Sequence, residues 1–159
     1  MTEGGRARLA RRQAELLSAL VRPEAYLPGF DAERVRAAAA SLRSKRVRAI
    51  ARTWPRLAAA LGPDFAGEVS RHVVEHPSPP ADGALSDGRA WARDLAARSR
   101  LPWEGRLELL AVELRWRWGA DGRRRQRRFA AGLAVGRPLR LAVAVRGHWV
   151  GERWLRFPR

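Results

Sequence analysis

The chain has 159 residues, 46% of them apolar, which is enough for one domain with a hydrophobic core and too apolar for a disordered chain. It contains no cysteine, which excludes disulfides, thiolate metal sites and cysteine nucleophiles. The net charge of +16, from 32 basic and 16 acidic residues, predicts an acidic partner such as nucleic acid, an acidic peptide or an acidic protein surface.

The arginine content has a second explanation. Only Lys45 among the basic residues is a lysine, and the chain also has 14 glycines and 10 prolines. Arg, Ala, Gly and Pro share GC-rich codons, so a GC-rich genome would raise the arginine count regardless of function. That bias does not explain why acidic residues are only half as numerous, and both explanations stay open.

The beginning of the chain, MTEGGRARLARRQ, lacks the apolar segment of a signal peptide. Nowhere does an apolar run approach the roughly 20 residues that a membrane span needs. We therefore expect a soluble, cytoplasmic protein that does not bind membranes.

The first two predicted helices occupy the N-terminal third of the chain. In residues 8–21 leucines recur at helical spacing, which predicts an amphipathic helix. The second helix is expected over residues 31–53. Asp31 can accept hydrogen bonds from the backbone N–H groups of its first turn. Pro55 disfavours helical geometry at Trp54 and should end it.

Four shorter helices are expected to follow, each begun by a residue that suits a helix start. Their first residues or caps are Pro55, Pro63, Ser86 and Pro102, and the predicted spans are residues 55–61, 63–75, 86–99 and 102–118. Trp54, Trp91 and one of Trp116 and Trp118 should be buried within these helices.

After Gly119 the pattern changes from helical to alternating. GADG predicts a turn, RRRQRR a charged connector, and three segments predict strands: RFAAGLAV, PLRLAVAV and HWVGERWLRF. In the second segment one face of the strand should be better buried, since Leu139, Leu141, Val143 and Val145 alternate with Arg140, Ala142 and Ala144. The predicted fold class is α+β, with a helical domain over residues 1–118 and a small antiparallel sheet over 119–159. Such a sheet must pack on the helices or on a partner.

One side of the second predicted helix is basic. Phosphates supply most non-specific affinity for nucleic acid, so this side could bind DNA; a solvated face in an arginine-rich chain is the alternative. Its members are Arg34, Lys45, Arg48 and Arg52.

The N-terminal part resembles a known family. The segments that carry the resemblance are RQAELLSAL, GFD at 29–31, the arginine-rich helix, WPRLAAALGPDF, HP at 76–77 and LP at 101–102. Over residues 11–116 they are similar to the N-terminal domain of HvfC/BufC accessory proteins, which has been labelled a DNA-binding domain. The remainder looks like the β-rich tail of a related actinobacterial group. The resemblance implies either DNA binding or pairing with a TIM-barrel multinuclear iron enzyme to which a precursor peptide is presented. It implies no catalytic residues.

The segment His72-Val73-Val74-Glu75-His76 matches the H-x-x-E-H pattern of inverted zinc peptidases. Histidines four residues apart on a helix can reach one zinc ion, with the glutamate as base. His76 directly precedes Pro77, however, and so lies at a helix end. A histidine at the edge of the core and one at a helix end are the preferred interpretation, without a metal or other cofactor.

The C-terminal part carries the second set of candidate binding residues. An exposed tryptophan flanked by arginines could stack on a base or anchor a peptide, although ordinary packing is the alternative. The arginine run could hold phosphates or an acidic peptide, or be a solvated linker. The candidates are Arg123, Arg124, Arg125, Arg127, Arg128, Arg146, Trp149, Arg153 and Trp154.

No phosphate-binding loop, dinucleotide fingerprint or nucleophile elbow occurs, so no motif supports an enzyme. We expect a non-catalytic adaptor that captures an acidic peptide or protein client for a partner enzyme, by pairing the client with a free edge of the C-terminal sheet. A DNA-binding protein is the alternative, and a purely structural subunit is a third hypothesis.

Overall fold

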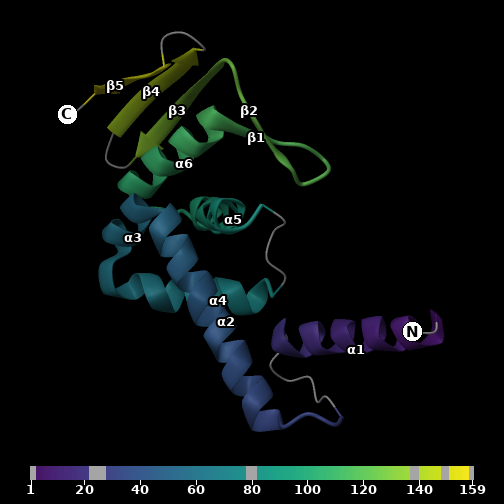
Figure 1. The fold of residues 1–159 in the computed structure, drawn as a ribbon. Helices are drawn as coiled ribbons and strands as arrows, with labels where there is room; N and C mark the ends of the chain where they lie inside the picture. The colour runs from purple at the N-terminus through teal and green to yellow at the C-terminus, as the bar shows by residue number, and fades with distance from the viewer. Residues whose placement is uncertain (1–2, 22–27, 78–81, 137–139, 148–150, 158–159) are drawn as a thin grey trace. The chain divides into compact units, whose positions relative to one another are not determined.

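The computed structural model describes residues 3–21, 28–77, 82–136, 140–147 and 151–157 (Figure 1). Helices come first and antiparallel strands follow, which confirms the α+β fold class. The helices are α1 (Glu3–Val21), α2 (Ala32–Thr53), α3 (Pro55–Leu61), α4 (Phe65–Glu75), α5 (Ala84–Ala97) and α6 (Trp103–Arg115), with a 3-10 turn at Gly62–Asp64. The strands are β1 (Trp116–Trp118), β2 (Arg124–Gln126), β3 (Ala130–Gly136), β4 (Arg140–Gly147) and β5 (Gly151–Phe157).

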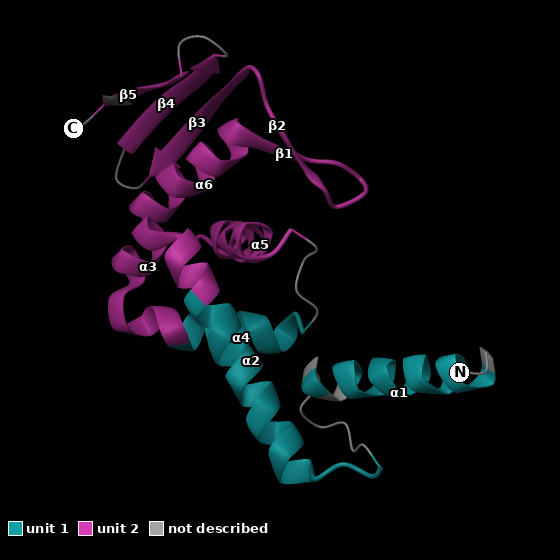
Figure 2. Cartoon of the chain, in the orientation of Figure 1, with its two compact units in different colours: residues 1–48, 67–78 teal, residues 49–66, 79–159 magenta. Residues whose placement is uncertain are grey.

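The chain divides into two compact units, coloured separately in Figure 2. Unit 1 comprises residues 1–48 and 67–78, and unit 2 comprises residues 49–66 and 79–159. The boundary between residues 118 and 119 remains a prediction. None of the described helices is long and apolar enough to cross a membrane.

The predicted ends of α2 and α3 are confirmed at the level of single hydrogen bonds. The backbone N–H groups of Glu33 and Arg34 donate to Asp31 Oδ1 at 2.8 and 3.3 Å, so Asp31 caps α2. Trp54 leaves the helical region, with φ −123° and ψ 60°, before Pro55 begins α3. Proline and aspartate act through local backbone geometry, which explains why these ends could be predicted.

Several of the predicted helix ends are wrong. Helix α1 begins at Glu3 rather than at residue 8, and α4 begins at Phe65, after a 3-10 turn, rather than at Pro63. Two further ends are decided by contacts with distant residues. Ser86 does not cap α5: the helix begins at Ala84 after Gly83, and the Ser86 hydroxyl instead accepts a 2.6 Å hydrogen bond from Trp118 Nε1. Helix α6 does not reach Trp118 either, because it ends at Arg115 and Trp116 is extended, with φ −127° and ψ 144°. In both cases a partner distant in sequence overrides a local preference.

In unit 1 an arginine closes the end of α4. Arg46 of α2 donates to the backbone carbonyls of His76 and Pro77 at 2.6 and 3.2 Å. Carbonyls at a helix C-terminus lack intrahelical partners and carry partial negative charge, so a guanidinium group stabilises them. Val69 and Val73 of α4 are buried.

The helical part of unit 2 is organised around two buried tryptophans, as predicted. Trp54 is fully buried and its Nε1 donates to the Leu85 carbonyl at 3.3 Å. Trp91 is 2% exposed and meets Phe65 edge-on, with ring centroids 5.4 Å apart. Gly88 lies against the Trp54 indole, where an added Cβ would come within 2.9 Å of Cε2. Only glycine lets α5 approach this ring.

Strands β3, β4 and β5 form one antiparallel sheet in that order, and α6 lies along one of its faces (Figure 1). This inner face is built from small residues, so the leucines of α6 come close to the strand backbones. One face of β4 is better buried than the other. It is the face of Ala142 and Ala144, both 0% exposed, and not the face of the leucine and valines, of which Val145 is 51% exposed. The core between helix and sheet comprises Leu107, Leu110, Leu114, Ala134, Ala142 and Ala144, with Trp103, Ala130 and Trp154 packed against it.

The segment RRRQRR is not a simple connector. Its residues Arg124–Gln126 form β2, which pairs antiparallel with β1. Asp121 holds the intervening turn by accepting the Arg123 N–H at 3.1 Å, and Arg127 N–H bonds to the Arg115 carbonyl at 2.9 Å. The interpretation of Trp116 and Trp118 as helical is corrected by the same pairing, since both belong to β1.

Candidate functional site

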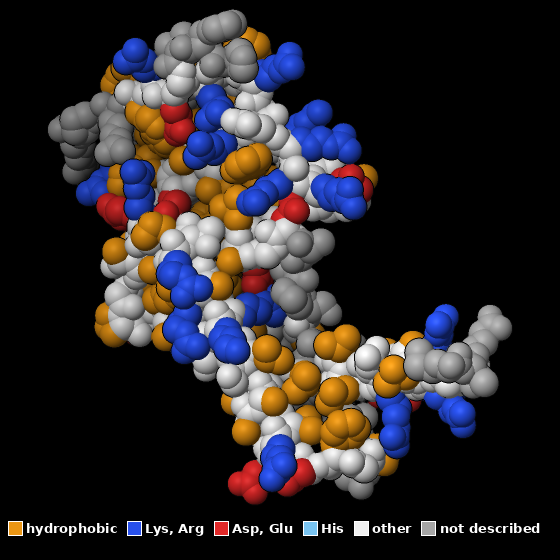
Figure 3. Space-filling view, viewed as in Figure 1, with side chains coloured by type: hydrophobic (Ala, Val, Ile, Leu, Met, Phe, Trp, Pro, Cys, Tyr) orange, Lys and Arg blue, Asp and Glu red, His pale blue; other side chains and the backbone are white. Residues whose placement is uncertain are grey.

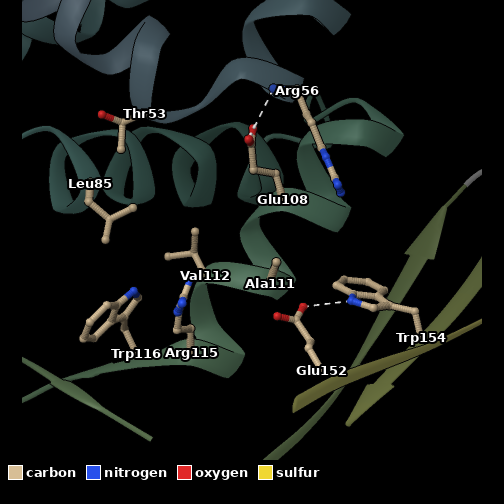
Figure 4. Close-up of a pocket in the computed structure, with 10 residues that line it drawn as sticks. All are labelled: Thr53, Arg56, Leu85, Glu108, Ala111, Val112, Arg115, Trp116, Glu152 and Trp154. Atoms are coloured by element: carbon tan, nitrogen blue, oxygen red, sulfur yellow. Dashed lines mark hydrogen bonds between the residues drawn. The ribbon is translucent and has the colours of Figure 1, made fainter. Parts of the chain in front are cut away.

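Unit 2 contains a pocket of about 510 Å³ that is open to solvent (Figure 4). Helix α6 supplies its base, and β1 and β5 supply two tryptophans. The lining residues are Thr53, Arg56, Leu85, Glu108, Ala111, Val112, Arg115, Trp116, Glu152 and Trp154.

Glu108 lies at one end of the pocket, and its carboxylate is already hydrogen-bonded to the chain itself. Its two carboxylate oxygens accept the backbone N–H groups of Arg56 at 3.2 Å and Leu57 at 2.8 Å. These N–H groups belong to the first turn of α3, where a helix lacks internal acceptors and favours negative charge. Glu108 is 8% exposed, and its role is to fix α3 onto α6.

Two indole rings give the pocket its apolar walls. Trp154 of β5 donates from Nε1 to Glu152 Oε1 at 2.8 Å, which fixes both side chains (Figure 4). Trp116 of β1 carries the Arg124 guanidinium over its ring at 5.0 Å from the centroid. Both rings are half-buried and present part of their surface to a ligand.

Arg56 and Arg115 approach the pocket from different sides (Figure 4). Both side chains belong to exposed residues, and neither forms an ion pair with a described acidic residue. Glu108 and Glu152 keep their negative charge, but their carboxylates already accept hydrogen bonds from the chain itself, so Arg56 and Arg115 are the charged groups of the lining that can pair with a ligand. The pocket therefore suits a carboxylate or another small anionic group, with an apolar part against the indoles.

A second cluster beside β1 is structural. Arg89 bonds Glu113 at 2.9 Å and lies over the Trp118 ring, 4.1 Å from its centroid. Burial lowers the pKa of Arg89, and the neighbouring Glu113 carboxylate acts in the opposite direction. Arginine stays protonated through such shifts, so the Arg89–Glu113 pair and the Trp118 ring together fasten α5 to α6 and β1.

The C-terminal candidates are divided between the two faces of the sheet. Trp154 lies on the inner face and lines the pocket, whereas Arg153 is exposed on the outer face. Arg146 is on the inner side, opposite Glu152 in the register. Trp149 lies outside the described residues.

The arginine run lies in and beside the β1–β2 hairpin. Arg124 N–H donates to Asp82 Oδ2 at 2.7 Å, and Arg125 reaches Asp121 at 3.4 Å. Arg127 Nε donates to the Trp116 carbonyl at 3.3 Å. Arg123 and Arg128 are exposed. The run thus extends the positive surface beside Trp116. Figure 3 shows further arginine side chains on the visible surface of unit 2.

The basic residues of α2 form a separate exposed stripe. Arg34, Lys45, Arg48 and Arg52 are all exposed. Their spacing places them on one side of a continuous helix, over about 27 Å. Arg34 lies 3.7 Å from Asp31, and both side chains are well exposed, so this ion pair stabilises little.

The two histidines of the H-x-x-E-H segment stack on each other. Their ring centroids are 4.4 Å apart, His72 is 4% exposed, and His76 Nδ1 lies 3.1 Å from the His72 carbonyl. Within the described residues no group of three or more potential metal ligands occurs. The pair belongs to α4 and its end.

The sequence did not single out Arg56, Arg115 or Trp116 as binding residues. Each lies at the end of a helix or the start of a strand, and they meet only because α3 packs on α6 and β1 follows α6 directly. Trp154 had a usable signal: a tryptophan flanked by arginines in a predicted strand.

The fold and site thus define an α+β protein with an anion-compatible pocket beside a small antiparallel sheet. The family model described as SCO6045-like, C-terminal domain, matches residues 10–97, more than half of the chain. The chain belongs to this family. The match runs from within α1 to the end of α5 and stops before α6 and the sheet. No curated protein and no solved structure matches the chain.

Proposed function

We propose that this protein is a non-catalytic adaptor that binds an extended acidic client peptide and presents it to a partner enzyme. The observation that carries the proposal is an open sheet edge beside the pocket. Strand β5 pairs with β4 on one side, and no described strand pairs with the other side of β5. Unpaired strand edges accept an added strand from another chain.

The pocket supplies the specificity that main-chain pairing lacks. Successive side chains of a strand alternate between the faces of a sheet, so every second residue of an added strand points to the inner side. On that side β5 contributes Glu152 and Trp154 to the pocket wall. An inward aspartate or glutamate of the client would pair with Arg56 and Arg115, and the inward residues two positions away from it would rest against the indoles.

The partner enzyme of this proposal is inferred from the family resemblance. The HvfC/BufC-like segments over residues 11–116 support pairing with a multinuclear iron enzyme that modifies ribosomally made peptides. In this proposal the chain acts in the cytoplasm and breaks no covalent bond. The family match over residues 10–97 supports the helical part as a shared module.

Binding of a labelled decapeptide of alternating threonine and glutamate tests the client site. We expect fluorescence anisotropy to detect binding, with much weaker binding of the threonine–lysine peptide. The double variant Arg56→Ala, Arg115→Ala should weaken binding by about tenfold, the effect of losing a charge-assisted hydrogen bond. The double variant Arg34→Ala, Arg48→Ala removes the same two charges from exposed sites on α2 and serves as the control, with little change expected.

Backbone methylation of the same peptide tests strand addition. Two versions carry N-methyl groups on alternate residues, in the two possible phases. In an antiparallel or parallel edge pairing only one phase points its N–H groups at β5. We expect that phase to abolish binding and the other to retain it. Equal binding by both versions would remove strand addition from the proposal.

DNA binding is the second candidate, favoured by the exposed stripe of Arg34, Lys45, Arg48 and Arg52 on α2. A 20-base-pair duplex should then bind with an affinity that falls steeply with salt, in proportion to the phosphates neutralised. Replacing the four residues with alanine should reduce that slope. An unchanged slope would exclude the stripe as the DNA contact.

A further inference from the structure

The outer face of the β3–β4–β5 sheet is an apolar surface with no covering element among the described residues of unit 2. The register places its side chains in rows across the strands: Leu133, Val143 and Leu155 form one row, and Val135, Leu141 and Phe157 form the next. Leu133, Val135, Leu155 and Phe157 are 56%, 58%, 64% and 54% exposed. Val145 adds a fifth large apolar side chain at 51%.

We propose that this outer face is a docking surface for a partner protein, which covers it with an amphipathic helix whose apolar stripe is flanked by acidic side chains. The inference goes beyond client binding, because the face lies on the opposite side of the sheet from the pocket and does not require it.

Two observations favour a helix as the occupant: the dimensions of the face, and the packing of helix α6 against the opposite face of the same sheet. The apolar rows extend about 13 Å along the strands and about 10 Å across them, which about three helical turns would cover. On the inner face α6 does the same with Leu107, Leu110 and Leu114 at helical spacing. Sheets that are apolar on both faces have both faces covered.

The charge around the face selects an acidic partner over a second copy of the chain. Residues 115–159 contain thirteen arginines and two acidic residues, Asp121 and Glu152. Asp121 is bonded in the β1–β2 turn, and Glu152 is bonded to Trp154 on the inner side. Arg153 lies on the outer face itself, beside Val145 in the register.

The apolar rows are smaller than a typical interface, so the charged residues around them help to determine which partner binds. A standard interface buries about 800 Å² on each partner, so contacts must extend beyond the apolar rows onto their border. Two copies facing each other would bring like charges together in chains of +16 each. An anionic lipid surface would also attract this positive charge, and the vesicle measurement below tests it as a different occupant.

The probe is an 18-residue helical peptide with a leucine stripe flanked by glutamates, and its counterpart has lysines in place of the glutamates. We expect the full chain to bind the acidic helix and to bind the lysine version at least about tenfold more weakly. Leu155→Glu should weaken binding of the acidic helix by about tenfold or more, because it places a charge in the apolar contact. Equal binding of both peptides, or none by the acidic one, would overturn the proposal.

Leu17→Glu is the matched control, since Leu17 of α1 is 63% exposed against 64% for Leu155 and the charge change is the same. It should leave binding within about twofold. Leu133→Thr gives a second variant that preserves strand preference if Leu155→Glu fails to fold, with an expected loss of about threefold.

Two further measurements identify a different occupant. Light scattering after size exclusion would overturn the proposal if wild-type protein is a dimer that Leu155→Glu converts to monomer, since the face then binds a second copy. Sedimentation with phosphatidylglycerol vesicles would overturn it if wild-type protein binds them and Leu155→Glu does not. A monomer that binds the acidic helix and ignores the vesicles supports the proposal.

Discussion

Both faces of the C-terminal sheet are apolar, but the residues of the inner face are small and those of the outer face are large. The inner face has Gly132, Gly136, Ala142 and Ala144, all pressed close to α6, while the outer face has leucines, valines and Phe157 half-exposed. Small residues let a helix approach the strands closely, and the helix then supplies the large side chains of the core. Large residues without a covering helix leave an apolar surface. Residue size on a strand is therefore a poor guide to which face is buried.

The largest expected effect comes from placing the same charge on the two faces at neighbouring positions. Ala144→Glu puts an unpaired carboxylate in the α6 contact and should lower the free energy of unfolding by about 3–5 kcal/mol. Val145→Glu points outward from a site that is 51% exposed and should cost less than about 1 kcal/mol. Urea unfolding followed by circular dichroism measures both. Similar losses at the two positions would contradict the difference between the faces.

An intermediate effect is expected from adding one methyl group to the inner face. Gly136→Ala would place a Cβ 2.5 Å from Trp103 Cε3, and a rigid ring cannot yield, so a loss of about 1–3 kcal/mol is expected. Gly132→Ala meets only the tip of Leu110, also at 2.5 Å, which can rotate away. Thermal unfolding of the pair should place Gly132→Ala close to wild type. If Gly132→Ala were instead the less stable of the two variants, the clash would be relieved by movement of the whole of α6 and not of single side chains.

The smallest stability effect should come from making the outer face polar. Leu155→Thr places a β-branched residue, which favours strands, at an exposed position and removes little buried surface, so the free energy of unfolding should change by less than about 1 kcal/mol. The same variant should bind the acidic helix less well. A large loss of stability, measured by urea unfolding, would show that the outer face belongs to the core of the free protein.

Several elements followed from the sequence because their causes are local. Asp31 caps α2 and Pro55 begins α3 through contacts within four residues, and both were predicted. The same kind of reasoning failed at Ser86, whose hydroxyl bonds Trp118, and at Trp116, which pairs with Gln126 in a hairpin. Those outcomes depend on residues ten or more positions away, which a local pattern does not specify.

The candidate site was predictable only in part for the same reason. A tryptophan among arginines pointed to Trp154, but Arg56 and Arg115 become neighbours of that ring only when α3 and the sheet pack on α6. By itself the sequence determined the order of helices before strands, the ends set by proline and aspartate, and the excess of positive charge. Tertiary structure alone decided which sheet face is buried and which side chains share a pocket, because close approach depends on the size of residues that meet across elements.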